Sequence, residues 1–316
     1  MTIPFPLASG RYETGPAMRR FGQAGQGFPA ESGHFQPDDR FVETIDTKLA
    51  LLLRAPEECH LTARGADPGA LRATLLEAFR LLAAEHPHLA VVDGEAVCLR
   101  HLGLRVAGDR ADRVDEPWPG LAEAAEYLTA QHGLALWGNA LALAAQEDLA
   151  IVTGPGGTLE WLHVCLPSGW APAEKIGLPF GAVHQPVAHS EALVAGQERI
   201  VRAMIEAGPF VRYVWGIHRD GALCHNPRLH RSAPWGDNPA TQAWFRVERQ
   251  TTKGFPALNR ALFTIRYWVE PLTDTAADPW RRERLCTALA GMDEVELVYK
   301  GLTPAARQQL VDWLST

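Results

Sequence analysis

The β segments between residues 149 and 269 constrain the fold more than any other feature of the sequence. Within 149–165, two apolar runs are separated by Thr153-Gly154-Pro155-Gly156-Gly157, and this pattern predicts a β-hairpin. A phosphate-binding loop is the alternative, but it needs a helix directly after the glycines, where a second strand is predicted instead. Further β segments are predicted at 211–218, 244–251 and 261–269.

Polar side chains alternate along the last two of these segments. Side chains two residues apart lie on the same face of a strand, so Arg246, Glu248 and Gln250 share one face, and Thr264 and Arg266 share one face of the next strand. A sheet with a polar face of this kind lines a site. We therefore expect a functional pocket within residues 161–270.

Helical patterns flank the β segments. Asp67 and Pro68 are an N-cap and a first-turn proline, and apolar residues recur at helical spacing from there to His86. Residues 1–40 are rich in Gly and Pro and predict an extended N-terminal arm. Since the rest shows no repeat and no linker, we expect one domain over 41–316 that ends in helices within 276–316. Other helices are predicted at 121–131, 191–207, 280–289 and 304–314.

Composition excludes several classes of protein. The 316 residues carry a net charge of -7, which argues against binding to nucleic acid. Five cysteines lie far apart with no CxxC pair, as expected of reduced thiols in a cytoplasmic protein. No signal peptide and no membrane-spanning segment is predicted.

Motifs of common enzymes are missing from the sequence. Ser168 is not in a G-x-S-x-G elbow, and there is no HExxH, CxxC or GxGxxG pattern. Cys224, His225 and His230 lie close together in the sequence, but a closed zinc site needs four ligands and only three are present. Hydrolase, zinc-enzyme and dinucleotide-binding functions are therefore disfavoured.

Histidines and arginines gather in the β-rich half. A haem needs an apolar slot, an imidazole for the iron and guanidinium groups for the propionates, and this half offers candidates for each. Hydrogen-bonded structural histidines are the alternative. The histidines are His163, His184, His189 and His218, and ten arginines lie between Arg199 and Arg266.

Two blocks of sequence carry a resemblance to a known family. The first joins Pro167-Ser168-Gly169-Trp170, residues 174–179 (EKIGLP) and residues 183–187 (VHQPV). The second joins residues 246–251 (RVERQT) to residues 262–266 (LFTIR). Together with weaker matches at 146–149 and 212–215, they resemble the haem-dependent oxidative N-demethylase family, alpha subunit, over about residues 40–300.

This resemblance implies a fold and a reaction. The fold is α+β: a PAS-like antiparallel sheet with helices packed on one side, and with helical N- and C-terminal extensions. The reaction is oxidation of a small secondary amine such as dimethylamine by dioxygen at haem b, with electrons from flavin and iron-sulfur partner proteins. A haem-based gas or redox sensor on the same scaffold is the alternative function.

Site residues follow from the matched motifs. His184 is the expected iron ligand, with His189 as its competitor. Charged and aromatic side chains of the β segments are expected to bind the haem or to take part in catalysis. The haem-binding candidates are Arg212, Arg246 and Trp215, and the catalytic candidates are Glu248, Arg249 and Arg266.

The sequence departs from the family pattern at two places. Val214 stands where the family has an asparagine before the tryptophan, and residues 252–255 (TKGF) replace the family's continuation after Gln250-Thr251. Both departures put the lining of the substrate site in question.

Overall fold

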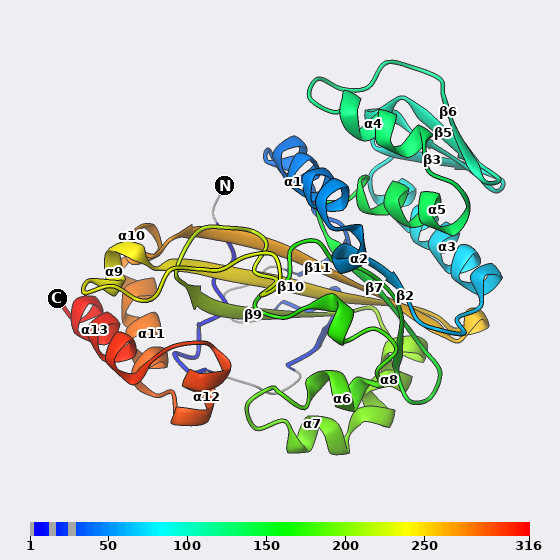
Figure 1. The fold of residues 1–316 in the computed structure, drawn as a ribbon. Helices are drawn as coiled ribbons and strands as arrows, with labels where there is room; N and C mark the ends of the chain where they lie inside the picture. Colours follow the sequence, from blue (N-terminus) through cyan, green and yellow to red (C-terminus); the bar gives the residue numbers. More distant parts are fainter. Residues whose placement is uncertain (1–2, 13–16, 25–29) are drawn as a thin grey trace.

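The structure is a computed structural model that describes residues 3–12, 17–24 and 30–316. A seven-stranded antiparallel sheet forms the centre of the molecule, and helices lie on opposite sides of it (Figure 1). In spatial order its strands are β1 (Arg19–Arg20), β9 (Phe210–His218), β10 (Trp244–Phe255), β11 (Arg260–Pro271), β7 (Asp148–Thr153), β8 (Thr158–His163) and β2 (His60–Thr62).

Tight turns produce the antiparallel pairing. The predicted hairpin is confirmed, because β7 and β8 pair around the turn at residues 154–157. Strands β10 and β11 pair over twelve residues and are joined by a short 3-10 turn that ends at Asn259. Asn259 has a φ of 50°, and asparagine is one of the few side chains that tolerate this left-handed conformation.

A second sheet was not predicted as a whole, although the Asp93-Gly94 turn between the apolar residues of 91–99 predicts the hairpin of its first two strands. The hairpin around Asp93 and Gly94 is half of a four-stranded antiparallel sheet that lies beside the N-terminal helices (Figure 1). Its strands have four residues each, which is too short for a clear alternation. They are β3 (Ala90–Asp93), β4 (Ala96–Leu99), β5 (Leu104–Ala107) and β6 (Arg110–Arg113).

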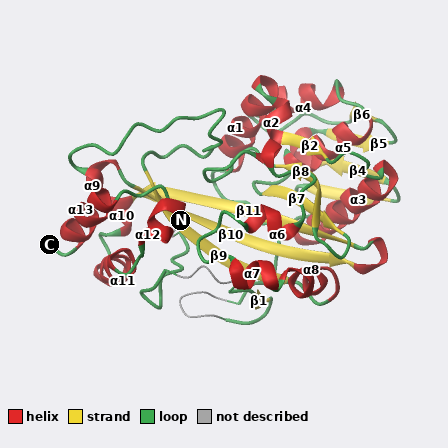
Figure 2. Ribbon diagram, turned by 60° about the horizontal axis from the view of Figure 1, so that its bottom comes forward, coloured by secondary structure: helices red, strands yellow, loops and turns green. Residues whose placement is uncertain are grey.

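Thirteen α-helices are present within the described residues, and Figure 2 shows them around the yellow strands. The predicted helix at 67–86 is α3, where the Asp67 carboxylate accepts hydrogen bonds from Gly69 N and Ala70 N. The first group of helices comprises α1 (Phe41–Arg54), α2 (Pro56–Cys59), α3 (Pro68–Glu85), α4 (Ala122–Thr129) and α5 (Gly133–Ala142). The second comprises α6 (Phe180–His184), α7 (Glu191–Ala195), α8 (Gln197–Glu206) and α9 (Pro239–Gln242). The C-terminal group comprises α10 (Leu272–Thr275), α11 (Pro279–Ala290), α12 (Glu294–Tyr299) and α13 (Pro304–Leu314).

The helices differ from the predictions at several places, and α1 and α12 were not predicted at all. The single helix predicted at 191–207 is divided at Gly196 into α7 and α8. Helix α5 was missed because its sequence, GLALWGNALA, is apolar all round and therefore lacks the amphipathic period.

Helices pack on both faces of the central sheet, whereas the resemblance implied one. Helix α8 covers one face, where Val201 packs on Val152 and Ala261. At the same end, the opposite face packs against α3 and α5, and both belong to the core around Trp161. The mixed, antiparallel character of the fold is confirmed, and the PAS-like label stays an expectation.

The N-terminal arm lies over the sheet near the C-terminal helices. Ile3, Phe5 and Leu7 are buried in a core with Phe245 and Trp268 of the sheet. Helices α11, α12 and α13 complete this core. The arm therefore adds apolar contacts to the domain although the described part of 1–40 contains only the two-residue strand β1.

Candidate functional site

The two faces of the central strands differ in how well they are covered. In β10 the side chains of Val247, Arg249 and Thr251 are buried, whereas Glu248 and Gln250 between them are half-buried. Strand β10 has a neighbour on each side, so this exposure reflects an uncovered face and not a sheet edge. The uncovered part is limited to the surroundings of Glu248 and Gln250, because Arg246 and Thr252 of the same face are buried and α8 covers its end near Gly254. We call the face that bears Glu248 the open face and the opposite one the closed face.

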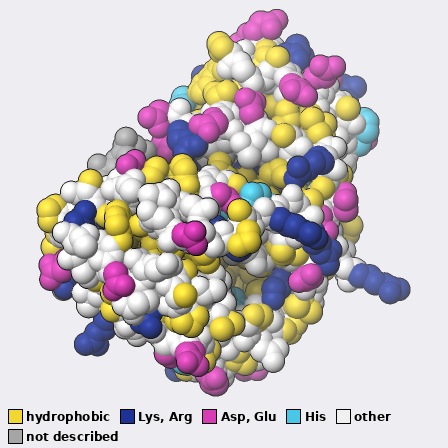
Figure 3. Space-filling view, turned by 60° about the vertical axis from the view of Figure 1, so that its left-hand side comes forward, with side chains coloured by type: hydrophobic (Ala, Val, Ile, Leu, Met, Phe, Trp, Pro, Cys, Tyr) yellow, Lys and Arg dark blue, Asp and Glu magenta, His cyan; other side chains and the backbone are white. Residues whose placement is uncertain are grey.

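Residues of three strands share the open face. In the strand register Glu248 lies between Val214 of β9 and Tyr267 of β11, and Gln250 lies between Arg212 and Ile265. The surface is hollowed near the centre of Figure 3, with basic side chains gathered beside the hollow. The predicted common face of Arg246, Glu248 and Gln250 is confirmed by the same register.

His184 ends the short helix α6. Its Nδ1 lies 2.8 Å from the carbonyl oxygen of Phe180, and the two rings stack with centroids 4.0 Å apart. A carbonyl oxygen only accepts, so Nδ1 carries the proton and Nε2 keeps its lone pair. Burial, together with the charges of Arg212 and Lys175, lowers the pKa of His184 to about 4, although the hydrogen bond to Phe180 O acts in the opposite direction. The ring is therefore neutral near pH 7 and holds an unprotonated nitrogen, as an iron ligand must.

Arg212 is a cation with no hydrogen bond from its guanidinium among the described residues. Its Nε is buried without a partner, and burial lowers its pKa, while Tyr299 and Glu248 act in the opposite direction. A buried donor without an acceptor is costly, and a carboxylate is the acceptor that fits a guanidinium best. Arg212 is thus available to an anionic group that enters the open face.

Glu248 is oriented by its neighbour on the strand. Gln250 Nε2 donates to Glu248 Oε2 at 2.7 Å. Arg246, two residues away on the same face, forms no ion pair with Glu248, because its guanidinium is bound elsewhere. Nearby, burial lowers the pKa of Lys300 to about 8, and its Nζ donates to Trp215 O at 2.7 Å.

Arg246 lies on the open face but is already satisfied. It donates to Ser168 Oγ at 2.6 Å, to Leu223 O at 2.8 Å and to Leu166 O at 2.6 Å, and it lies over the ring of Tyr267. A haem propionate would have to replace these hydrogen bonds. Arg246 therefore holds the loops that contain Leu166, Ser168 and Leu223 against the sheet.

The remaining candidates lie on the closed face. In register, Arg249 is directly beside Arg266, and each pairs with a carboxylate of the arm: Arg249 Nη2 with Glu31 Oε2 at 2.9 Å, and Arg266 Nη2 with Asp38 Oδ2 at 2.6 Å. Trp215 is buried in the core of the C-terminal helices. The structure therefore does not bring these three residues together with His184.

His189 has a different environment from His184. Its side chain is 47% exposed, and Nε2 lies 2.7 Å from Asp293 Oδ2 at the start of α12. The carboxylate occupies the nitrogen that would bind a metal. His189 thus links the α6–α7 region to α12, and His184 is the better placed of the two imidazoles.

The departures from the family pattern fall in different places. Val214 lies on the open face, directly beside Glu248, so the missing amide would have lined this face. Gly254 lies under α8, where a Cβ atom would overlap the carbonyl oxygen of Ile205. The change around residue 254 therefore serves the packing of α8.

Three open-face neighbours were missed from the sequence. Tyr12, Tyr299 and Lys300 act on the charges of Arg212 and Glu248, and burial raises the pKa of both tyrosines. They come from the arm and from the end of α12, and no motif marks them. Only the scarcity of lysine, four in the chain, could have drawn attention to Lys300.

Comparisons with known proteins identify the family of the chain. Across the described residues, no helix is both long and apolar enough to cross a membrane. A search of curated proteins found no match. A family model described as haem-dependent oxidative N-demethylase, alpha subunit-like, matches residues 31–310 and so includes the arm carboxylates, His184 and the open face. The chain belongs to this haem-dependent oxidative N-demethylase alpha subunit-like family.

Proposed function

We propose that the chain binds haem b against the open face, with His184 as the iron ligand, and oxidises a small amine with dioxygen. The family description supports haem dependence and an oxidative demethylase. Two observations support the assignment of the ligand: Nδ1 of His184 is held by Phe180 O, which leaves the Nε2 lone pair free to bind a metal, and the charge of Arg212 on the open face acts on the same ring.

The residues present fit the chemical groups of a haem. His184 supplies a neutral imidazole, and Arg212 supplies an unpaired guanidinium for a propionate. Val214, which is half-buried between Arg212 and the strand neighbour Glu248, supplies apolar surface on the open face. When bound, haem would supply the redox chemistry that activates dioxygen for attack on an N-methyl group.

The chain's own side chains would bind and orient the amine. Glu248 is a carboxylate whose Oε2 is fixed by Gln250, which leaves Oε1 to hold the ammonium form or to take its proton. Tyr12 and Tyr299 have raised pKa values, so they stay protonated at neutral pH and act as hydrogen-bond donors. Glu248 is therefore the proposed catalytic base, and the roles expected of Arg249 and Arg266 become structural ones.

Electrons would come from a partner protein. The description of the family as alpha subunit-like supports the presence of a further subunit, and we propose that it carries flavin and an iron-sulfur cluster. The cysteines of this chain are free thiols, which supports a location in the reducing cytoplasm.

Haem binding is tested first. The full chain is purified from haem-replete cells as wild type, as His184→Ala and as His189→Ala, and the Soret band is recorded. We expect a Soret band in wild type and in His189→Ala, and its loss or a marked shift in His184→Ala. An unchanged band in His184→Ala rejects the ligand, and no band in any protein rejects the cofactor.

Catalysis is tested separately with dimethylamine, dioxygen and a reductase preparation. We expect formaldehyde from wild type, and a loss of at least about 100-fold from Glu248→Gln with its Soret band retained. Haem binding without formaldehyde would favour the sensor or binding-module alternative.

A further inference from the structure

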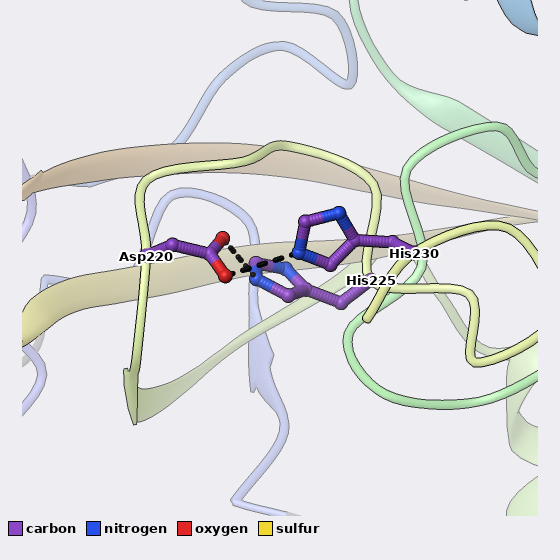
Figure 4. A group of neighbouring side chains, drawn as sticks. All are labelled: Asp220, His225 and His230. Atoms are coloured by element: carbon purple, nitrogen blue, oxygen red, sulfur yellow. Dashed lines mark hydrogen bonds and ion pairs between the residues drawn. The ribbon is translucent and has the colours of Figure 1, made fainter. Parts of the chain in front are cut away.

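Three side chains of one loop converge beyond the end of β9. Asp220, His225 and His230 place one ligand atom each within 4.8 Å of one another. His225 Nε2 lies 3.0 Å from Asp220 Oδ1, and His230 Nε2 lies 3.0 Å from Asp220 Oδ2. Figure 4 shows the carboxylate pointing at both imidazole rings.

We propose that Asp220, His225 and His230 form a binding site for one divalent transition-metal cation such as Zn²⁺, separate from the haem site. Two imidazoles and a carboxylate are a common donor set for such cations, with water in the remaining position. Two bonds of about 2.0 Å at a tetrahedral angle place their ligand atoms about 3.3 Å apart. The separations of 3.0 Å found here differ from this value by only a few tenths of an ångström.

Backbone contacts hold this loop in the required conformation. His230 N donates to Asn226 O at 2.8 Å and so closes a turn that returns His230 to the side of His225. His225 N donates to Pro167 O at 2.9 Å, and Asn226 Nδ2 donates to Glu58 Oε2 at 3.1 Å. The ligands are therefore positioned by contacts that do not depend on the cation, which lowers the entropic cost of binding.

The protonation states suit a metal. Burial, together with the charge of Arg246, lowers the pKa of His225 to about 4, so its ring is neutral at pH 7. Burial opposes ionisation of Asp220, but hydrogen bonds from Ser232 and His230 outweigh it and hold the pKa of Asp220 well below its usual value. A neutral imidazole and an ionised carboxylate are the forms that coordinate a cation.

Cys224 is not part of this group, although the sequence placed it beside His225. It packs instead against the core that contains Cys59 and Cys165. Asp220 takes the third position, which makes the site an open one with three protein ligands and not a closed structural zinc site. The cation would also tie down the loop whose Leu223 carbonyl receives Arg246.

A second cluster, formed by His189, Asp293 and Glu296, provides a matched control. It also has three candidate ligands within 4.8 Å, but it is more exposed, and Asp293 and Glu296 bond to each other's backbone nitrogens in the capping box of α12. Its carboxylates are thus already engaged, so we expect it to bind cations only weakly.

Zinc binding by the full chain is the test. The protein is treated with EDTA, dialysed and titrated with Zn²⁺ in competition with a chromophoric chelator. We expect one tightly bound zinc per wild-type chain. The affinity should fall at least about 100-fold in His230→Gln and in Asp220→Asn, and should not change in His189→Asn.

Two further measurements keep the test decisive. Circular dichroism without zinc shows whether each variant is folded, and X-ray absorption at the zinc edge should show nitrogen and oxygen ligands at about 2.0 Å. If wild type binds no zinc tightly, or if folded His230→Gln and Asp220→Asn bind it as wild type does, the cluster is only a hydrogen-bonded clamp and the proposal is overturned. The Soret band of His230→Gln should match that of wild type, so failure here is distinct from failure of haem binding.

Discussion

Replacing Arg249 with Met removes the strongest link between the arm and the sheet. Arg249 donates to Glu31 Oε2 through Nε at 3.1 Å and through Nη2 at 2.9 Å, and it also donates to the carbonyl oxygens of Gly33 and His34. Both charged side chains are at most 4% exposed. The substitution would leave the Glu31 carboxylate buried, with Gln36 and Tyr213 as its remaining side-chain donors among the described residues.

The expected cost follows from this burial. Removing one partner of a buried ion pair costs about 3–5 kcal/mol, because the other charge stays desolvated. For a chain of this size, that corresponds to a fall in Tm of roughly 10 °C. Since Arg249 lies on the closed face, the Soret band and the amine affinity should change little.

The matched control is Arg40→Met. Arg40 also makes two short hydrogen bonds to one carboxylate, at 2.9 and 2.7 Å from Glu43, but its side chain is 47% exposed. The free energy of unfolding should fall by less than about 0.5 kcal/mol. Denaturant unfolding of both variants gives the comparison. Equal losses in the two variants, or lost haem binding with unchanged stability in Arg249→Met, would refute the structural role of Arg249.

Two further predictions concern stability. Gly254→Ala should lower the free energy of unfolding by about 2 kcal/mol or more, because the new Cβ would overlap Ile205 O. The control, Gly156→Ala, has open space around the new Cβ and should change the free energy of unfolding by less than about 0.5 kcal/mol. Equal thermal midpoints for the two variants would contradict this prediction. Burial lowers the pKa of His101 to about 4. Protonation at low pH therefore favours the unfolded chain, and this residue should cost about 3 kcal/mol of stability as pH falls from 6.5 to 4. Denaturant midpoints measured across this range should fall less steeply in His101→Gln, and parallel slopes in the two proteins would count against the assignment.

Local chemistry made some elements predictable from the sequence. The start of α3 could be predicted from Asp67 and Pro68, because an N-cap depends only on residues within the first turn of the helix. The side chains of β10 that share a face could also be predicted, because successive side chains of a strand point to opposite faces of the sheet. His184 was predicted as the iron ligand from a sequence motif, and the structure adds the contact of its Nδ1 with Phe180 O, four residues away.

Contacts between distant residues could not be predicted in this way. Nothing near Arg249 in the sequence indicates that its partner is Glu31, 218 positions away. The same holds for Arg266 and Asp38, so arginines of the closed face and of the open face looked alike in the sequence. Asp220 was overlooked because a carboxylate in a loop is ordinary until the fold of the loop sets two imidazoles against it.

The side-by-side placement of Arg249 and Arg266 also limits how far the chain can be shortened. Two like charges on adjacent interior strands repel each other, and here the counter-charges come from Glu31 and Asp38. A chain trimmed to begin at Phe41 would keep both guanidinium groups in a dry interior and lose both carboxylates. The arm is thus part of the folded sheet, because its two carboxylates neutralise the two buried arginines. We therefore expect the smallest stable fragment to begin before Glu31.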